Sequence, residues 1–191
     1  MSAPGRAASQ VEYCLRLHTQ RLDLVACTPE VARAALLNGQ GMGSLIQAGP
    51  AEEWPLQGLR GFLPFYIADL ERDPSLLGWG AWLLVQAEER LIIGDAGFHG
   101  MPARDGSVEL GYSVVPAYRR LGYCSEAVRA MLGWAFSHWR VKRVTATCEA
   151  DNAASSGLLA KLGMRQVGAS RGSLKWEILR ENWRWPATTL A

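Results

Sequence analysis

The sequence has few cysteines, no long apolar run and almost no excess of charge. Its four cysteines, Cys14, Cys27, Cys124 and Cys148, form no C-x-x-C pair, so their spacing supports neither a metal site nor a disulfide framework. The formal net charge is only +2, which argues against a nucleic-acid binder with a broad basic face. No apolar run is long enough to span a bilayer. We therefore expect reduced thiols, no metal, and a cytoplasmic protein without a nucleic-acid or membrane partner.

The two ends of the chain show no targeting pattern. The first ten residues are small and polar, with Arg6 and no apolar stretch behind it, which is unlike a signal peptide. We predict flexible tails at 1–12 and 186–191. The chain has 191 residues, of which 49% are hydrophobic and 20% charged, and it contains no repeat or low-complexity linker. These features favour one globular domain over residues 13–185.

The first half of the chain contains signals for helices and for a meander of strands. Thr28, Pro29 and Glu30 are typical of an N-cap, a first helical position and an acidic first turn. The glycine-rich stretch 39–50 is expected to be a loop, and Pro64 is expected to bend or split the helix around it. The predicted segments are a strand at 22–25, helices at 28–37 and 55–71, and strands at 79–85, 91–98 and 108–115.

In the second half the hydrophobic period changes. Apolar residues recur at helical spacing from 122 to 139, and Gly163 is expected to end a shorter helix at 152–162. Strands are predicted at 144–148, 165–168 and 174–179. The order strand, helix, strand over 108–148 implies a parallel, right-handed crossover. The fold class is therefore mixed α+β, with a mostly antiparallel sheet of about six or seven strands and helices on both faces.

One turn in the middle of the chain has the features of a phosphate-binding site. The strand that ends before Pro116 leads through Arg119, Arg120 and Gly122 into the long helix. A helix start has N–H groups without internal partners and the positive end of the helix dipole, and Gly122 lets a ligand approach the backbone closely. The helix end contributes only about 0.3–2 kcal/mol, so the arginines and the shape of the turn must supply the rest. A structural turn with solvated arginines is the alternative.

The segment Arg119-x-x-Gly122-x-Cys124 resembles the [Q/R]-x-x-G-x-[G/A] turn with which GNAT acetyltransferases bind the pyrophosphate of CoA. The approach Pro116-x-Tyr118-Arg119 and the strand Glu109-Leu110-Gly111-Tyr112 resemble the same family. Asn152-x-Ala154-Ser155, leading to Lys161-Leu162-Gly163, is similar to the second signature of the branch that acetylates the N-termini of ribosomal proteins. The resemblance covers about 17–183. Neither of the common nucleotide-binding glycine motifs occurs in a fitting context.

This resemblance implies a three-layer fold with a splayed parallel strand pair, and acetyl-CoA as co-substrate. It implies direct attack on the thioester by a neutral amine in a ternary complex. The amine would be the N-terminal α-amine of a protein or a small-molecule amine, and the family is compatible with a homodimer. Cys124 replaces the usual Gly or Ala, and we expect it to pack tightly against the phosphates. Backbone N–H groups near Val114 and Val115 are expected to face the acetyl oxygen and pantetheine. The residues expected to bind the cofactor are Val114, Val115, Arg119, Arg120, Leu121, Gly122, Tyr123, Cys124, Ser125, Asn152, Ser155 and Lys161.

Two residues are candidates for the chemistry. Glu109 lies on the strand that enters the site, on the same face as Gly111 and Ser113, and is the predicted base; an exposed or ion-paired strand carboxylate fits it equally well. Ser155 lies one turn after Asn152 and is predicted to donate to the CoA sulfur; an ordinary polar first-turn residue is the alternative. Asn152 also suits an N-cap.

The acid that protonates the leaving thiolate has no assignment from the resemblance. Many GNAT enzymes have a tyrosine where this chain has Leu159, so a CoA-binding regulatory or scaffold protein without turnover is the alternative function. A phosphate-binding module of another class is a third hypothesis. His99 could line the acceptor cleft, and Trp54, Trp79 and Trp82 could form its wall, although tryptophans belong more often to the core.

Overall fold

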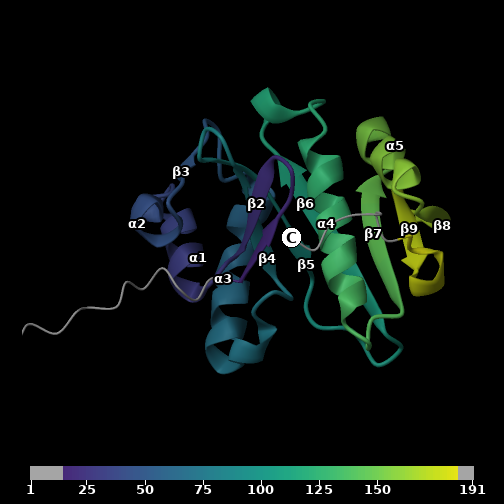
Figure 1. The fold of residues 1–191 in the computed structure, drawn as a ribbon. Helices are drawn as coiled ribbons and strands as arrows, with labels where there is room; N and C mark the ends of the chain where they lie inside the picture. The colour runs from purple at the N-terminus through teal and green to yellow at the C-terminus, as the bar shows by residue number, and fades with distance from the viewer. Residues whose placement is uncertain (1–14, 185–191) are drawn as a thin grey trace, which may run out of the picture.

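The computed structural model describes residues 15–184, and the predicted tails, 1–12 and 186–191, lie outside them. In this part of the chain nine strands form one sheet in the order β1-β2-β4-β5-β6-β7-β9-β8, with β3 paired to β5. Figure 1 shows α4 across the front of this sheet and α3 behind β2 and β4. The strands are β1 (Arg16–His18), β2 (Leu22–Ala26), β3 (Gly49–Pro50), β4 (Ala81–Gln86), β5 (Leu91–Phe98), β6 (Ser107–Val114), β7 (Arg143–Glu149), β8 (Arg165–Ser170) and β9 (Ser173–Leu179).

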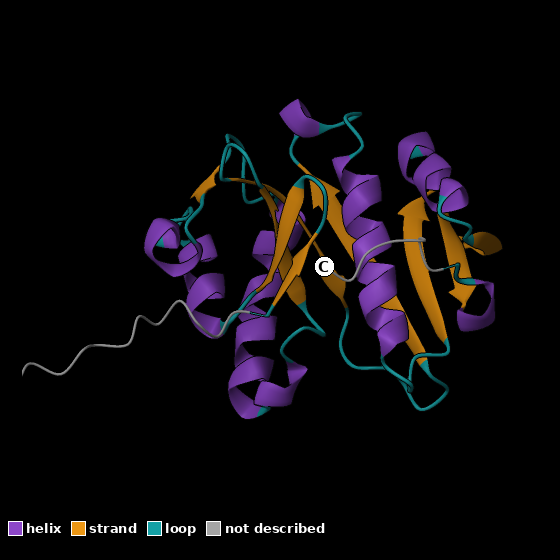
Figure 2. Cartoon of the chain, in the orientation of Figure 1, coloured by secondary structure: helices purple, strands orange, loops and turns teal. Residues whose placement is uncertain are grey.

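The helices begin where the local sequence supplies a start signal. At α1 the Thr28 hydroxyl accepts the N–H of Val31 and Pro29 occupies the first turn, as the N-cap pattern predicts. At α5 the side chain of Asn152 accepts the N–H of Ser155. The helices, shown in Figure 2, are α1 (Pro29–Leu36), α2 (Met42–Ile46), α3 (Gln57–Arg72), α4 (Tyr123–Ser137) and α5 (Ala153–Lys161).

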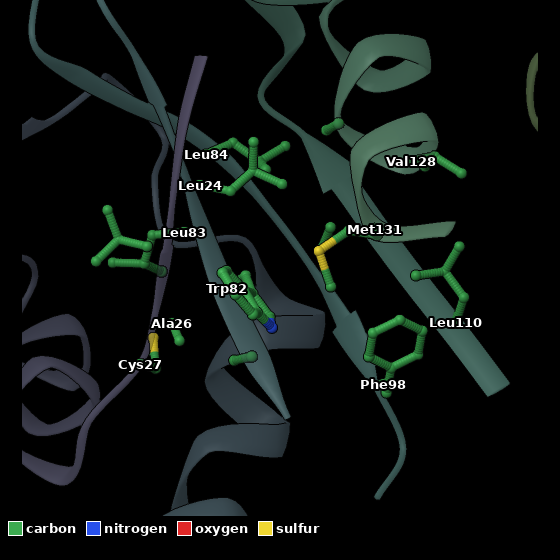
Figure 3. Packing of buried hydrophobic residues seen from close by; sticks show 14 of the residues in the cluster. Leu24, Ala26, Cys27, Trp82, Leu83, Leu84, Phe98, Leu110, Val128 and Met131 are labelled. Carbon is green, nitrogen blue, oxygen red and sulfur yellow. The ribbon is translucent and has the colours of Figure 1, made fainter. Parts of the chain in front are cut away.

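A large part of the core lies between α4 and the strands of the first half of the sheet, and the same cluster continues under α1 and α3. Figure 3 shows Met131 of α4 facing Trp82, Phe98 and Leu110 from three neighbouring strands. Trp82 is fully buried, and its indole N–H donates to the carbonyl of Gly78, so burial leaves no polar group of this ring unpaired. This packing holds the start of α4 in one position relative to the end of β6.

The strands β6 and β7 separate halfway along their length. They are parallel and pair only at Ser107 with Arg143, Val108 with Val144 and Glu109 with Thr145. Beyond this point β6 continues beside β5 as far as Val114, and β7 continues beside β9. The predicted parallel crossover through α4 is confirmed, with α4 lying across the region where β6 and β7 separate (Figure 1). Residues from the end of β6, the turn before α4 and α5 line a groove there.

Several local predictions were wrong. The stretch 39–50, predicted as a loop, contains α2 and β3, and β1 was missed; with them the described sheet has more strands than the six or seven expected. Two-residue and three-residue strands are defined by their sheet partners, so they have no period in the sequence. Pro64 does not split α3, which runs unbroken from Gln57 to Arg72.

Candidate active site

The N-terminus of α4 is open toward the groove. Gly122 precedes the helix with a φ of 88°, and no side chain caps the first turn. A positive φ of this kind is favourable only for glycine among ordinary residues, and Arg120 also has a positive φ, of 61°. The turn therefore directs the first N–H groups of α4 outward, where they can bind an anion.

A clamp formed by Arg21 and Glu126 of α4 stabilises this turn. Arg21 donates through Nε to Oε2 of Glu126 at 2.8 Å and through Nη1 to the carbonyl of Leu121 at 2.9 Å. Its guanidinium also lies over the ring of Tyr123, 4.5 Å from the centroid. Burial tends to raise the pKa of Glu126, but hydrogen bonds from Thr19 and Arg21 outweigh this and hold the pKa below its usual value. Sequence reasoning did not find this clamp, because its partners lie 105 residues apart.

The groove contains a cavity of about 730 Å³ between the end of β6, the turn and α5. It is large enough for part of a nucleotide-sized ligand. Among the predicted cofactor-binding residues, two are absent from its described lining, Val115 and Leu121. The lining consists of Tyr112, Ser113, Val114, Tyr118, Arg119, Arg120, Gly122, Tyr123, Cys124, Ser125, Asn152, Ala154, Ser155, Gly157, Leu158 and Lys161.

Three residues predicted to bind the cofactor have hydrogen-bond partners within the protein. Val115 is fully buried and its N–H donates to the carbonyl of Ile93 at 2.9 Å, so this amide already has a protein partner. Leu121 is exposed and contributes its carbonyl to Arg21. Arg119 donates through Nε to the carbonyl of Val114 at 2.8 Å, which ties the arginine to the strand that it follows.

A hydroxyl pair lies at the inner end of the cavity. The hydroxyl oxygens of Tyr112 and Ser155 are 2.6 Å apart, which joins β6 to α5 across the groove. Burial raises the pKa of Tyr112 to about 12, and the hydrogen bond with Ser155 opposes this rise, so the phenol keeps its proton. Burial also raises the pKa of Cys124 to about 12, so this thiol is protonated and a poor nucleophile at neutral pH. Leu159 is fully buried.

A second cavity, of about 240 Å³, lies between α3 and the sheet and shares Tyr112 and Ser113 with the first. Its walls are mostly apolar. Its one carboxylate is Asp95 of β5, which accepts a hydrogen bond from the hydroxyl of Ser113. Burial raises the pKa of Asp95 to about 6, while the Ser113 hydrogen bond lowers it. The other described residues of this lining are Gly58, Leu59, Phe62, Gly80, Ala81, Ala96, Gly97, Phe98, His99 and Gly111.

The predicted base, Glu109, lies further along the same face of β6. Its carboxylate accepts the hydroxyl of Thr147 at 2.9 Å and lies 3.8 Å from Nδ1 of His99. It lines a third, polar cavity of about 510 Å³, to which His99 also contributes. His99 therefore lies where the two cavities of this face meet, whereas Glu109 faces only the polar one.

The three tryptophans considered as a wall of the acceptor cleft are not among the described residues that line the 240 Å³ cavity. Trp54, Trp79 and Trp82 are all buried, and Trp79 packs on Trp134 with ring centroids 4.6 Å apart. Their size favours the core because each buries a large apolar area. In contrast, the sequence reading missed Asp95, although an acidic residue within the apolar strand 91–98 was a signal that could have revealed it.

Two further properties of the described chain bear on its chemistry. Within residues 15–184 no three His, Cys, Asp or Glu side chains are grouped so that they could hold a metal ion. None of the helices in the same range is both long and apolar enough to cross a membrane.

Known proteins are similar to this chain in sequence or in fold. Residues 20–165 match the family model of the acetyltransferase (GNAT) domain. YjdG, an uncharacterised N-acetyltransferase of Bacillus subtilis, is 36% identical over 111 residues, which are 58% of this chain and 66% of YjdG. The ribosomal-protein-S5-alanine acetyltransferase of Vibrio fischeri superposes with a TM-score of 0.62 at 17% identity, over 89% of this chain and 99% of that one. The microcin C7 self-immunity acetyltransferase MccE, solved with acetyl-CoA and AMP, superposes with a TM-score of 0.58 at 15% identity, over 84% of this chain and 93% of that one.

The chain belongs to the GNAT acetyltransferase family, because the family model matches most of its length. The matched segment spans less than two thirds of YjdG and 51% of a second relative, YoaA of Bacillus subtilis. The structural matches at this level of identity establish the fold alone.

Proposed function

We propose that this protein transfers the acetyl group of acetyl-CoA to an amine by direct attack in a ternary complex. One observation carries the proposal. The large cavity at the open start of α4 meets the smaller cavity under α3 at Tyr112 and Ser113, so a thioester in the first can face an amine in the second.

The residues of the turn suit a CoA pyrophosphate. The first N–H groups of α4 have no side-chain cap, and a Cβ at Gly122 would come within 3.1 Å of Arg21, so glycine keeps the approach open. Arg119, Arg120 and Lys161 add positive charge around the same cavity. In this proposal they hold the phosphates together with Tyr123, Cys124 and Ser125, while Val114 and Asn152 lie beside the pantetheine.

The hydroxyl of Ser155 is the proposed proton donor to the leaving CoA sulfur. Its hydrogen bond with Tyr112 keeps it oriented at the inner end of the cavity, and a protonated phenol can return a proton to it. This pair also weakens the case for a CoA-binding protein without turnover, which depended on Leu159. No described residue favours that alternative.

The acceptor is an α-amine of a peptide or protein N-terminus, or a small amine. At pH 7 the removal of a proton costs about 1.4 kcal/mol for an amine of pKa about 8, but about 4.6 kcal/mol for a lysine of pKa about 10.4. An α-amine therefore requires less of the base. Glu109, which lines the polar cavity, stays a predicted base. A cytoplasmic location and a homodimer are also part of the proposal.

The test is an assay of thiol release with acetyl-CoA and a panel of acceptors. The panel contains hexapeptides with N-terminal serine, alanine or methionine, and the small amines spermidine and benzylamine. We expect tight binding of acetyl-CoA in calorimetry and acceptor-dependent release of CoA. Binding without transfer to any amine, in the panel or in labelled-acetyl mass spectrometry of a cell extract, would favour the scaffold alternative. Absence of CoA binding would refute both.

A further inference from the structure

We propose that Asp95 is the general base that takes the proton from the acceptor amine. This inference rests on the proposed function and assigns a role that neither the turn motif nor the second signature assigns. It starts from the position of a single carboxylate in the smaller cavity.

The position of Asp95 relative to both cavities supports this role. Asp95 pairs with Ser113 across β5 and β6, and Ser113 lines both the cavity under α3 and the large cavity. The Asp95 carboxylate also acts electrostatically on the thiol of Cys124 at the start of α4. Asp95 therefore lies at the junction where an amine would meet a thioester.

The surroundings of Asp95 suit a base that receives a cation. The lining of the cavity includes Gly58, Leu59 and Phe62 from α3, Ala81 from the start of β4, and Gly80 just before it. None of these has a charge. The titratable groups that face it are Tyr112 from β6, Cys124 from α4 and His99, the residue that follows β5. No Lys or Arg occurs among the described lining residues, so a protonated amine has no competing cation there.

The hydrogen bonding of Asp95 leaves it able to accept a proton. Its one hydrogen-bond donor among residues 15–184 is the neutral hydroxyl of Ser113, bonded to Oδ1. Burial raises its pKa to about 6. The carboxylate is thus ionised at neutral pH, yet its pKa is closer to that of an amine than an exposed carboxylate's would be.

Glu109 is less well placed for the same role. It lies four residues before Ser113 on β6, or about 13 Å along the strand, and its carboxylate is held by Thr147 and faces His99. It does not belong to the lining of the cavity that meets the thioester site. An amine within reach of Tyr112 and Ser113 is therefore closer to Asp95.

The proton balance of the step is as follows. The ammonium loses one proton to the Asp95 carboxylate, and the neutral nitrogen then forms a bond to the thioester carbon. The C–S bond breaks, and the sulfur takes the proton of the Ser155 hydroxyl, which Tyr112 replaces with its own. The excess proton on the nitrogen passes to water, and one proton from water restores the Tyr112 phenol. Asp95 then releases its proton to water, so the products are the acetamide, CoA thiol and one proton.

The test compares Asp95→Asn with the unchanged protein across pH 5.5 to 10. Asparagine keeps the oxygen that accepts from Ser113 but cannot take a proton. With the fastest acceptor of the panel, we expect kcat/KM at pH 7 to fall by about 10²-fold or more. The deficit should shrink toward pH 10, because the amine then loses its proton in solution. The Kd for acetyl-CoA should not change, and Asp69→Asn, an exposed substitution late in α3, should match the unchanged protein.

The unchanged protein provides a second measurement that does not depend on any variant. Its kcat/KM should show an acidic limb with an apparent pKa near 6, and this limb should stay in place when a peptide is replaced by an alkylamine of higher pKa. A deficit in Glu109→Gln with none in Asp95→Asn would overturn the inference while the proposed function stands. A limb that follows only the pKa of the amine would do the same. Failure of the unchanged protein to acetylate any amine would overturn both.

Discussion

Tyr112 and Ser155 join two elements that are separated by a crossover, with their hydroxyl oxygens 2.6 Å apart. Tyr112 belongs to β6, where this strand has already separated from β7, and Ser155 belongs to the first turn of α5. The bond crosses the groove that the splayed strands create. In the proposed reaction it links the strand beside the thioester to the helix with the proposed proton donor.

This pair leads to a prediction for the acid step. Replacement of Ser155 by alanine should lower kcat by about 10- to 100-fold, because general acid catalysis contributes 10²–10⁴-fold and water can substitute in part. The Kd for acetyl-CoA should change little. Calorimetry and thiol-release kinetics measure the two effects. Tyr112→Phe should have a smaller effect on kcat than Ser155→Ala, and the reverse order would assign the donor to Tyr112.

The proposed role of the turn before α4 in CoA binding can be tested by changing its charge and its shape in one variant. The double substitution Arg119→Ala with Gly122→Asp removes one positive charge and places a negative side chain where the helix start is open. We expect affinity for CoA to fall by at least about 100-fold, since charge-assisted contacts and the open backbone are both lost. Far-UV circular dichroism should be unchanged. Arg171→Ala, at the turn after β8, is the matched control, and equal affinity in both variants would show that the phosphates bind elsewhere.

The Arg21–Glu126 clamp should make stability depend on pH in the acidic range. The pKa of Glu126 is lower in the folded protein than the reference value of 4.5, so its ionised form stabilises the fold at neutral pH. This contribution should begin to shrink as the pH falls below about 4.5, where the unfolded chain takes up the proton, and should be lost once the pH passes the lower pKa of the folded protein. Glu126→Gln should lower the free energy of unfolding by about 1–2 kcal/mol at pH 7. Denaturant melts at pH 7 and pH 4 measure the difference, which should be smaller at pH 4.

Asp95 should affect stability with the opposite sign. Its pKa is raised from 3.8 to about 6 in the folded protein, so the ionised carboxylate destabilises the fold above pH 6 and has no such effect below pH 3.8. Asp95→Asn should therefore raise the free energy of unfolding at pH 8, by on the order of 2–3 kcal/mol. The gain should diminish as the pH falls toward 4. Thermal melts at several pH values measure this gain in stability. A gain that does not change with pH would contradict a raised pKa of Asp95 in the folded protein.

A larger side chain at Gly111 should partly fill the 240 Å³ cavity, in which the proposal places the acceptor amine. Gly111 lies on β6, and a Cβ built there would have His99 as its nearest neighbour, at 3.4 Å. Valine suits a strand and would occupy part of the 240 Å³ cavity. We expect Gly111→Val to raise KM for the amine by about 10-fold, since even one methylene matters in a small pocket, without a change in the Kd for acetyl-CoA. Gly61→Ala on α3, whose added Cβ meets nothing within 4 Å, should leave both constants unchanged.

The order of the main elements and most of the residues that line the 730 Å³ cavity could be predicted from the sequence. The N-cap at Thr28, the apolar stripe of α4 and the turn at Gly122 are local signals, in which neighbouring residues determine one another's conformation. The same is not true of Asp95. Its role depends on Ser113 across the sheet and on α3 above it, and neither neighbour is encoded in the strand itself.

The sequence by itself determined the crossover from β6 through α4 to β7 and the glycine turn at the uncapped start of α4, because helix starts and glycine turns depend on a few adjacent residues. Only the tertiary structure decided that Tyr112 meets Ser155 and that Arg21 meets Glu126. It also decided that Asp95 lines the smaller cavity, which adjoins the larger one at Tyr112 and Ser113. These contacts join residues distant in the chain, and their energies and pKa values arise from burial, which is a property of the packed protein and not of its local sequence.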